Sequence, residues 1–205
     1  MKEVDVTEGE NPNTNNSNSE ITNKYKRIGM YDGTLDDFID SISCSSVKFP
    51  YSLLANNIPL TISNISDYQL VKDIFNLSAI DLDTIVFDFP ITIINQDYSE
   101  TIVANNTEIS NLSAICDSAI INNLSAITCV DIQYPISISL FNLDNDQTTF
   151  ISIESDQDLF IFMNNLPQNE VYSVQYPINV SISSATSIVN NDSDLKSIID
   201  NCINN

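Results

Sequence analysis

The sequence contains no histidine and no tryptophan, and it has only 3 glycines among its 205 residues. Histidine is the commonest general base near neutral pH, so its absence excludes the Ser-His-Asp, Cys-His and HExxH arrangements. No stretch approaches the roughly 20 consecutive apolar residues that a membrane-spanning helix requires. The sequence therefore offers no recognisable catalytic constellation and no membrane span.

Positive charge is also scarce, with 7 Lys and Arg residues against 28 Asp and Glu residues and a formal net charge of −21. Such a surface repels phosphate backbones and anionic lipid headgroups, which argues against nucleic-acid binding. Lys24, Lys26 and Arg27 sit together, but this cluster is too short for a nucleic-acid patch, and we interpret it as a solvated link. Divalent cations and basic protein patches are the partners that the charge would attract.

What the chain does contain is an internal repeat with a period of about 86 residues. An aromatic residue followed by proline recurs at Pro50, Pro90, Pro135 and Pro177. Each proline is followed by a second apolar run and then by a helix-start signal, in which a capping side chain precedes a polar residue by three positions. These signals are Ser66 with Gln69, Asn105 with Glu108, Ser155 with Asp158, and Asn191 with Asp194. The pattern predicts the order strand, strand, helix, repeated four times.

Apolar and polar residues alternate around the prolines, with Ile132, Tyr134 and Ile136 on one face and Gln133 and Pro135 on the other. This period is typical of half-buried strands in antiparallel sheets, so we predict an α+β fold. Proline cannot donate to a strand ladder. Two interpretations follow: a kink that shapes a surface groove, or a bend that lets one strand serve two hairpins and discourages edge pairing. We favour the second.

The repeat and the composition divide the chain into four regions. Residues 1–23 are polar and predicted to form a disordered tether, because they cannot bury enough apolar surface to order themselves. Residues 24–43 are predicted to be a linker with a short helix around Leu35 to Ile42. Residues 44–122 form the first predicted module and residues 123–205 the second.

The cysteines follow the same repeat, since Cys44 and Cys129 open the two modules and Cys116 and Cys202 close them. Four cysteines allow three pairings. Equivalent modules should make equivalent bonds, which favours Cys44 with Cys116 and Cys129 with Cys202; the alternative joins Cys116 to Cys129 and Cys44 to Cys202. Paired cysteines indicate an oxidising compartment, whereas four reduced and buried cysteines would indicate the cytosol. Without histidine or a CxxC spacing, a zinc site is not expected.

The unit of Cys, aromatic-Pro-Ile, hairpin and capped helix, closed by a second Cys, resembles a family of uncharacterised surface lipoproteins of Bacteroidota over residues 44 to 202. The opening residues also resemble a mature lipoprotein whose anchoring Cys is replaced by Met1, followed by an acidic surface-export signal. The resemblance implies an exported protein, lipid-anchored at the outer membrane or cell surface. It carries over no catalytic residue, and the first module departs from the family where Pro59 enters its second strand.

We therefore expect a non-enzymatic, surface-exposed module for binding, adhesion or envelope assembly, with a protein or glycan partner and no cofactor. Membrane contact is expected only through an amino-terminal lipid anchor, which this chain lacks. One alternative is a hydrolase that uses acidic residues alone, for which Asp81 with Asp83 is a candidate pair. Another is a module stabilised by calcium at Asp144 and Asp146, whose oxygens suit a hard cation.

One short motif points to a modification. The triplet that begins after Cys116 resembles the O-glycosylation motif of Bacteroidota, with Ser118 as the acceptor. We expect Ser118 to lie in an exposed linker between the two modules.

Overall fold

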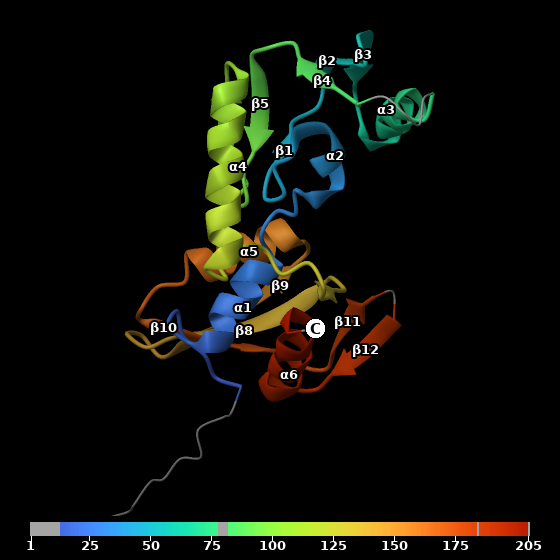
Figure 1. The fold of residues 1–205 in the computed structure, drawn as a ribbon. Helices are drawn as coiled ribbons and strands as arrows, with labels where there is room; N and C mark the ends of the chain where they lie inside the picture. The colour runs from blue at the N-terminus through green and yellow to red at the C-terminus, as the bar shows by residue number, and fades with distance from the viewer. Residues whose placement is uncertain (1–12, 78–81, 184, 205) are drawn as a thin grey trace, which may run out of the picture. The chain divides into compact units, whose positions relative to one another are not determined.

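The structure, a computed structural model, describes residues 13–77, 82–183 and 185–204, and it is an α+β protein with small antiparallel sheets (Figure 1). The chain divides into two compact units. Unit 1 combines Met1–Gly29 with Ile127–Asn205, and unit 2 consists of Met30–Ala126. No helix in the described ranges is long and apolar enough to cross a membrane.

Unit 2 holds the first predicted module. Its elements are η1 (Thr34–Asp36), α2 (Asp37–Asp40), β1 (Ser46–Val47), β2 (Tyr51–Ala55), β3 (Ile58–Ile62), η2 (Ile65–Asp67), α3 (Tyr68–Phe75), β4 (Ile85–Phe87), β5 (Ile91–Ile94), β6 (Glu100–Val103) and α4 (Asn106–Ile121). The strands form two antiparallel sheets with the orders β3-β2-β4 and β1-β5-β6. The short helix expected around Leu35 to Ile42 is present as η1 and α2.

Unit 1 holds the second predicted module and follows the same plan. Its elements are α1 (Glu20–Ile28), β7 (Asp131–Ile132), β8 (Ile136–Asn142), β9 (Gln147–Ile153), α5 (Asp156–Asn164), β10 (Glu170–Val174), β11 (Ile178–Ile182), β12 (Ala185–Val189) and α6 (Asp192–Ile203). The sheet orders are β10-β8-β9 and β12-β11-β7. The order of strands and helices from β7 to α6 therefore repeats that from β1 to α4.

Each aromatic-proline pair lies where the chain crosses from one sheet to the other. β1, before Pro50, pairs with β5, whereas β2, after Pro50, pairs with β4. In the same way, the strand expected to run through Pro135 is divided into β7 and β8, which belong to different sheets. The peptide bonds before Pro50, Pro90, Pro135 and Pro177 are cis, and all four prolines are exposed. Each strand that contains an aromatic-proline pair therefore contributes to two hairpins, as expected if the proline marks a bend.

The disulfides join Cys44 to Cys116 and Cys129 to Cys202. The pairing that the repeat favours is therefore confirmed, and each bond closes one module.

Three of the predicted helix starts are confirmed. The side chains of Asn105, Ser155 and Asn191 accept the backbone N–H of the residue three positions later. The fourth prediction was wrong by two residues, because Asn64 and not Ser66 caps the helical segment. Asn64 and Asp67 form a reciprocal capping box, which satisfies two backbone donors at once.

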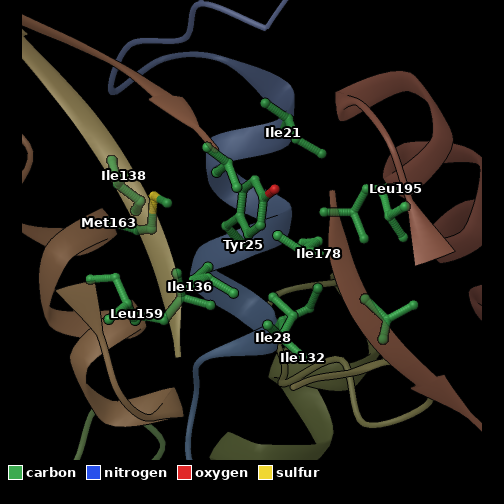
Figure 2. Packing of buried hydrophobic residues seen from close by; sticks show 14 of the residues in the cluster. Ile21, Tyr25, Ile28, Ile132, Ile136, Ile138, Leu159, Met163, Ile178 and Leu195 are labelled. Atoms are coloured by element: carbon green, nitrogen blue, oxygen red, sulfur yellow. The ribbon is translucent and has the colours of Figure 1, made fainter. Parts of the chain in front are cut away.

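The amino-terminal region differs from the sequence prediction. α1 begins inside the range predicted as a disordered tether, and residues 1–12 of that range lie outside the described residues. Ile21, Tyr25 and Ile28 are buried on one side of α1, and Figure 2 shows them among core side chains of β8, β11, α5 and α6. The segment 24–43 is therefore not a linker: the part up to Gly29 completes the core of unit 1, and the rest belongs to unit 2.

Close contacts hold α1 in place. A Cβ added to Gly29 would lie 2.7 Å from the backbone oxygen of Asp156, so the end of α1 approaches α5 at a distance that only glycine allows. Lys24 Nζ lies 2.5 Å from Asp200 Oδ1 on α6 and 3.6 Å from Glu20 Oε1. Interpreting the basic cluster as a solvated link was therefore wrong for Lys24.

Candidate functional site

Buried carboxylates are the first candidates for chemistry, and unit 2 holds two of them beside its core. The Asp36 side chain is 0% exposed and accepts hydrogen bonds from Ser46 Oγ at 2.7 Å, Tyr68 Oη at 3.1 Å and the Val47 backbone N–H at 3.2 Å. Asp40 Oδ1 accepts the backbone N–H of Ile42 at 2.9 Å. The Asp36 bonds fasten η1 to β1 and α3, and the Asp40 bond holds the turn that follows α2, so the geometry of the pair suits a structural role.

The two carboxylates are close enough to influence each other. Burial, together with the negative charge of Asp36, raises the pKa of Asp40 to about 8. Asp40 Oδ2 is buried and has no hydrogen-bond partner among the residues that the structure describes, which fits a protonated carboxyl group near neutral pH. Burial also raises the pKa of Asp36, although its hydrogen bonds oppose this.

Unit 1 has a different buried polar network. The hydroxyls of Tyr25 and Tyr176 are 2.8 Å apart, and Tyr176 donates to Asp192 Oδ1 at 2.5 Å. Asp192 Oδ2 accepts a hydrogen bond from Asn15 Nδ2 at 2.6 Å, while Tyr172 Oη lies 2.9 Å from Thr22 Oγ1. The network ties the segment before α1, and α1 itself, to the second module.

The residues singled out for calcium lie in the turn between β8 and β9. Asp144 Oδ2 accepts a hydrogen bond from Asn169 Nδ2 at 2.6 Å, and Asp146 adopts a φ of 53°. Within the described residues, no group of three or more acidic, cysteine or histidine side chains is placed to hold a metal ion. Calcium binding at Asp144 and Asp146 stays a prediction from the sequence.

The remaining predicted sites are scattered. Asp83 Oδ1 accepts a hydrogen bond from Asn56 Nδ2 at 2.9 Å, whereas its proposed partner Asp81 lies outside the described residues. Ser118 is exposed, but it lies within α4 and not in a linker, because the helix continues to Ile121. Its carbonyl oxygen accepts the backbone N–H of Asn122, so the predicted linker was wrong for this segment.

The outer face of the β3-β2-β4 sheet carries neighbouring exposed apolar side chains. Leu54 is paired with Pro59 on β3 and with Val86 on β4, and these three side chains form what we call the apolar row. Leu54 is 36% exposed and Val86 is 49% exposed, although strand alternation would reserve such positions for polar residues. A second row, Thr61, Ser52 and Asp88, runs beside it and is polar.

The two rows line a surface hollow of about 480 Å³. A neighbouring hollow of about 460 Å³ shares Ser52 and Asp88 with it and is lined further by Pro50 and Pro90. Pro50 and Pro90 therefore lie beside this second hollow, in addition to marking the crossings between sheets. Neither Asp36 nor Asp40 lines these hollows.

Unit 1 shows that the fold does not require leucine and valine in the apolar row. The position of Leu54, four residues after Pro50, corresponds to Ser139, four residues after Pro135. Val86 corresponds in the same way to Ser173, which pairs with Ser139. The second copy builds the same sheet with serines at these two positions, although it keeps an exposed apolar residue, Phe150, in the place of Pro59. The leucine and valine therefore need an explanation other than folding.

Compared with protein-family models, with curated proteins and with solved structures, the chain matches none of them. The candidate surface therefore has to be interpreted from its own geometry and from the comparison of the two copies within the chain.

Sequence reasoning missed the apolar row, although a signal was present. Aligning the four aromatic-proline segments position by position sets Leu54 against Ser139 and Val86 against Ser173. It missed Asp36 and Asp40 for a different reason. Asp36 accepts hydrogen bonds from Tyr68 and Ser46, which are distant from it in sequence. No local sequence pattern therefore identifies Asp36 as a buried carboxylate.

Proposed function

We propose that the protein is a non-enzymatic binding module that works outside the cytoplasm, and that the outer face of the β3-β2-β4 sheet is its binding surface. The observation that carries this proposal is the apolar row. Exposed leucine and valine side chains over a surface hollow are what a partner can cover, and the serines at the equivalent positions of unit 1 indicate that they are dispensable for folding.

The proposed compartment is supported by the two disulfides, because such bonds persist in oxidising environments. We propose that the protein is lipid-anchored at the outer membrane or cell surface, on the basis of its resemblance to surface lipoproteins of Bacteroidota. The partner is a protein or a glycan.

The compartment is tested by alkylating the protein in denaturant, without reductant, after recovery from its native host. Mass spectrometry should detect no alkylated cysteine, because Cys44, Cys116, Cys129 and Cys202 are all paired. Four alkylated cysteines would contradict an extracytoplasmic location.

The binding role is tested by applying the full chain to arrays of peptides and glycans. Saturable binding to one class is expected, and it should weaken when Leu54 and Val86 are replaced together by serine. Release of cleaved peptide or sugar by the chain would instead favour the hydrolase alternative. Absence of binding to either class would contradict the proposal.

A further inference from the structure

We propose that the outer edge of β4, with the apolar row beside it, binds an extended polypeptide segment that has an apolar centre and basic flanks. The segment would add one strand to the β3-β2-β4 sheet. This inference rests on the binding role proposed above and specifies the class of partner.

The backbone of β4 is arranged to accept another strand. The Asn56 N–H donates to the Thr84 oxygen, and the Asp88 N–H donates to the Ser52 oxygen, so Thr84 and Asp88 direct backbone groups towards β2. Because these groups alternate in direction along an antiparallel strand, those of Ile85 and Phe87 point away from β2. Among the described residues no strand pairs with this outer edge, since the sheet order ends at β4.

The second copy shows a single-residue backbone pairing in the equivalent place. Tyr172, five residues before Pro177, corresponds to Ile85, five residues before Pro90. The Asn15 N–H donates to the Tyr172 oxygen at 2.8 Å, and the Tyr172 N–H donates to the Asn15 oxygen at 2.8 Å. In unit 1 the amino-terminal segment therefore pairs with this edge at one residue, Asn15, and the described residues of unit 2 provide no counterpart.

The chemistry of the partner follows from the side chains around β4. Val86 belongs to the apolar row, so an added strand would place its own outward-facing side chains beside that row. The exposed carboxylates of Asp83 and Asp88 flank β4 at its two ends. An apolar segment with a lysine or arginine at each end would match this pattern of charge.

The same charges argue against a second copy of the chain as the occupant. Antiparallel pairing of β4 with β4 of another molecule would bring Asp83 of one copy close to Asp88 of the other. Like charges on facing strands are destabilising. The net charge of −21 adds a further repulsion between copies.

The test is a titration of the full chain with a blocked peptide in which valine alternates with threonine and each end carries lysine. We expect saturable binding and slower amide hydrogen exchange at Ile85 and Phe87. The amide of Val86, which faces β2, should change little. Replacing the terminal lysines with glutamate, or methylating alternate backbone nitrogens of the peptide, should each weaken binding about tenfold or more.

The matched protein variants are L54S/V86S, which should weaken binding about tenfold or more, and I102S, which should leave it unchanged. Ile102 is also exposed, but it lies on β6 in the other sheet of unit 2. Because unit 1 carries serines at the equivalent positions, L54S/V86S should keep its melting temperature, which is measured alongside.

Unchanged binding by L54S/V86S, or unchanged exchange at Ile85 and Phe87, would overturn the inference. A dimer in sedimentation velocity that depends on Leu54 and Val86 would overturn it in favour of a second copy. If the lysine-ended peptide does not bind while a glycan does, only this inference fails. If neither class binds, the proposed binding role fails with it.

Discussion

Tyr176 donates a hydrogen bond to Asp192, the first residue of α6, across 2.5 Å. Tyr134 makes the equivalent bond to Asp156, the first residue of α5, across 2.7 Å. Each tyrosine precedes a proline of the repeat, so the second module links each proline bend to the helix that follows it. In the first module phenylalanine takes both tyrosine positions, and the corresponding helix residues are Ile65 and Asn106. The hydroxyl and the carboxylate are therefore present together or absent together.

We predict that Y176F lowers the free energy of unfolding by about 2 kcal/mol, because a buried carboxylate loses a donor. The double variant Y176F/D192N should be less destabilised than the sum of the two single variants, since it reproduces the Phe89 and Asn106 combination of the first module. Urea unfolding of the two single variants and the double variant measures this coupling. Strict additivity would contradict the linkage.

Removing the disulfide of one module should destabilise that module. The bond between Cys44 and Cys116 spans 72 residues, and chain entropy predicts a loss of about 4 kcal/mol when both are replaced by alanine. The bond between Cys129 and Cys202 spans 73 residues and should matter equally. Thermal unfolding of C44A/C116A and of C129A/C202A measures the loss of stability in each case. A loss of stability in only one of the two variants would show that the modules without disulfides differ in residual structure.

Burial and the charge of Asp36 raise the pKa of Asp40 to about 8 in the folded chain, against about 3.9 for an unfolded aspartate. Between these values the folded state binds more protons than the unfolded state, so stability falls as the pH rises from about 4 to about 8. D40N should reduce this slope.

The measurement is the urea midpoint of the parent chain and of D40N at several pH values. Because the other acidic groups are common to both proteins, the difference between the two curves isolates Asp40. Parallel curves would show that Asp40 ionises in the folded state as it does in the unfolded one.

Tyr25 should be essential for unit 1, although it lies far from the second module in sequence. Its side chain is 0% exposed among residues of both sheets and both helices of that module. We predict that Y25A costs about 3–5 kcal/mol, by analogy with other truncations of buried aromatic residues. N23A, on the exposed side of the same helix, should cost less than about 1 kcal/mol. Chemical denaturation of both variants decides whether α1 is part of the core.

The repeat could be predicted because it depends on local chemistry. Asparagine or serine caps and period-two strands leave a pattern within a few residues, and the duplication made the cysteine pairing a matter of symmetry. The one helix cap that was predicted wrongly lies where two possible capping pairs overlap, Asn64 with Asp67 and Ser66 with Gln69. The sequence alone did not show which pair forms the cap. Asn64 prevails because the Asp67 side chain also accepts the backbone N–H groups of Ser63 and Asn64.

The role of α1 could not be read from composition. Its polar residues resemble a tether, yet Ile21, Tyr25 and Ile28 recur at the spacing of one helical face. The partners that bury this face lie beyond Ile127, and only tertiary structure brings them close. The apolar row differs from α1, because aligning the aromatic-proline segments marks Leu54 and Val86 as unusual, but only cross-strand pairing shows that the two side chains lie side by side on the outer face.

Unit 1 is built from two segments that are separated in sequence by unit 2, so its two parts are synthesised at different times. Arg27 and Ile127, joined by a hydrogen bond of 2.9 Å between backbone groups, mark the points where the polypeptide departs and returns. During synthesis or translocation, unit 2 is complete as soon as Ala126 emerges, whereas α1 has to wait for α6. We expect a nascent chain with unit 2 folded and α1 exposed as an amphipathic helix, which gives a chaperone a defined segment to hold until α6 has been made.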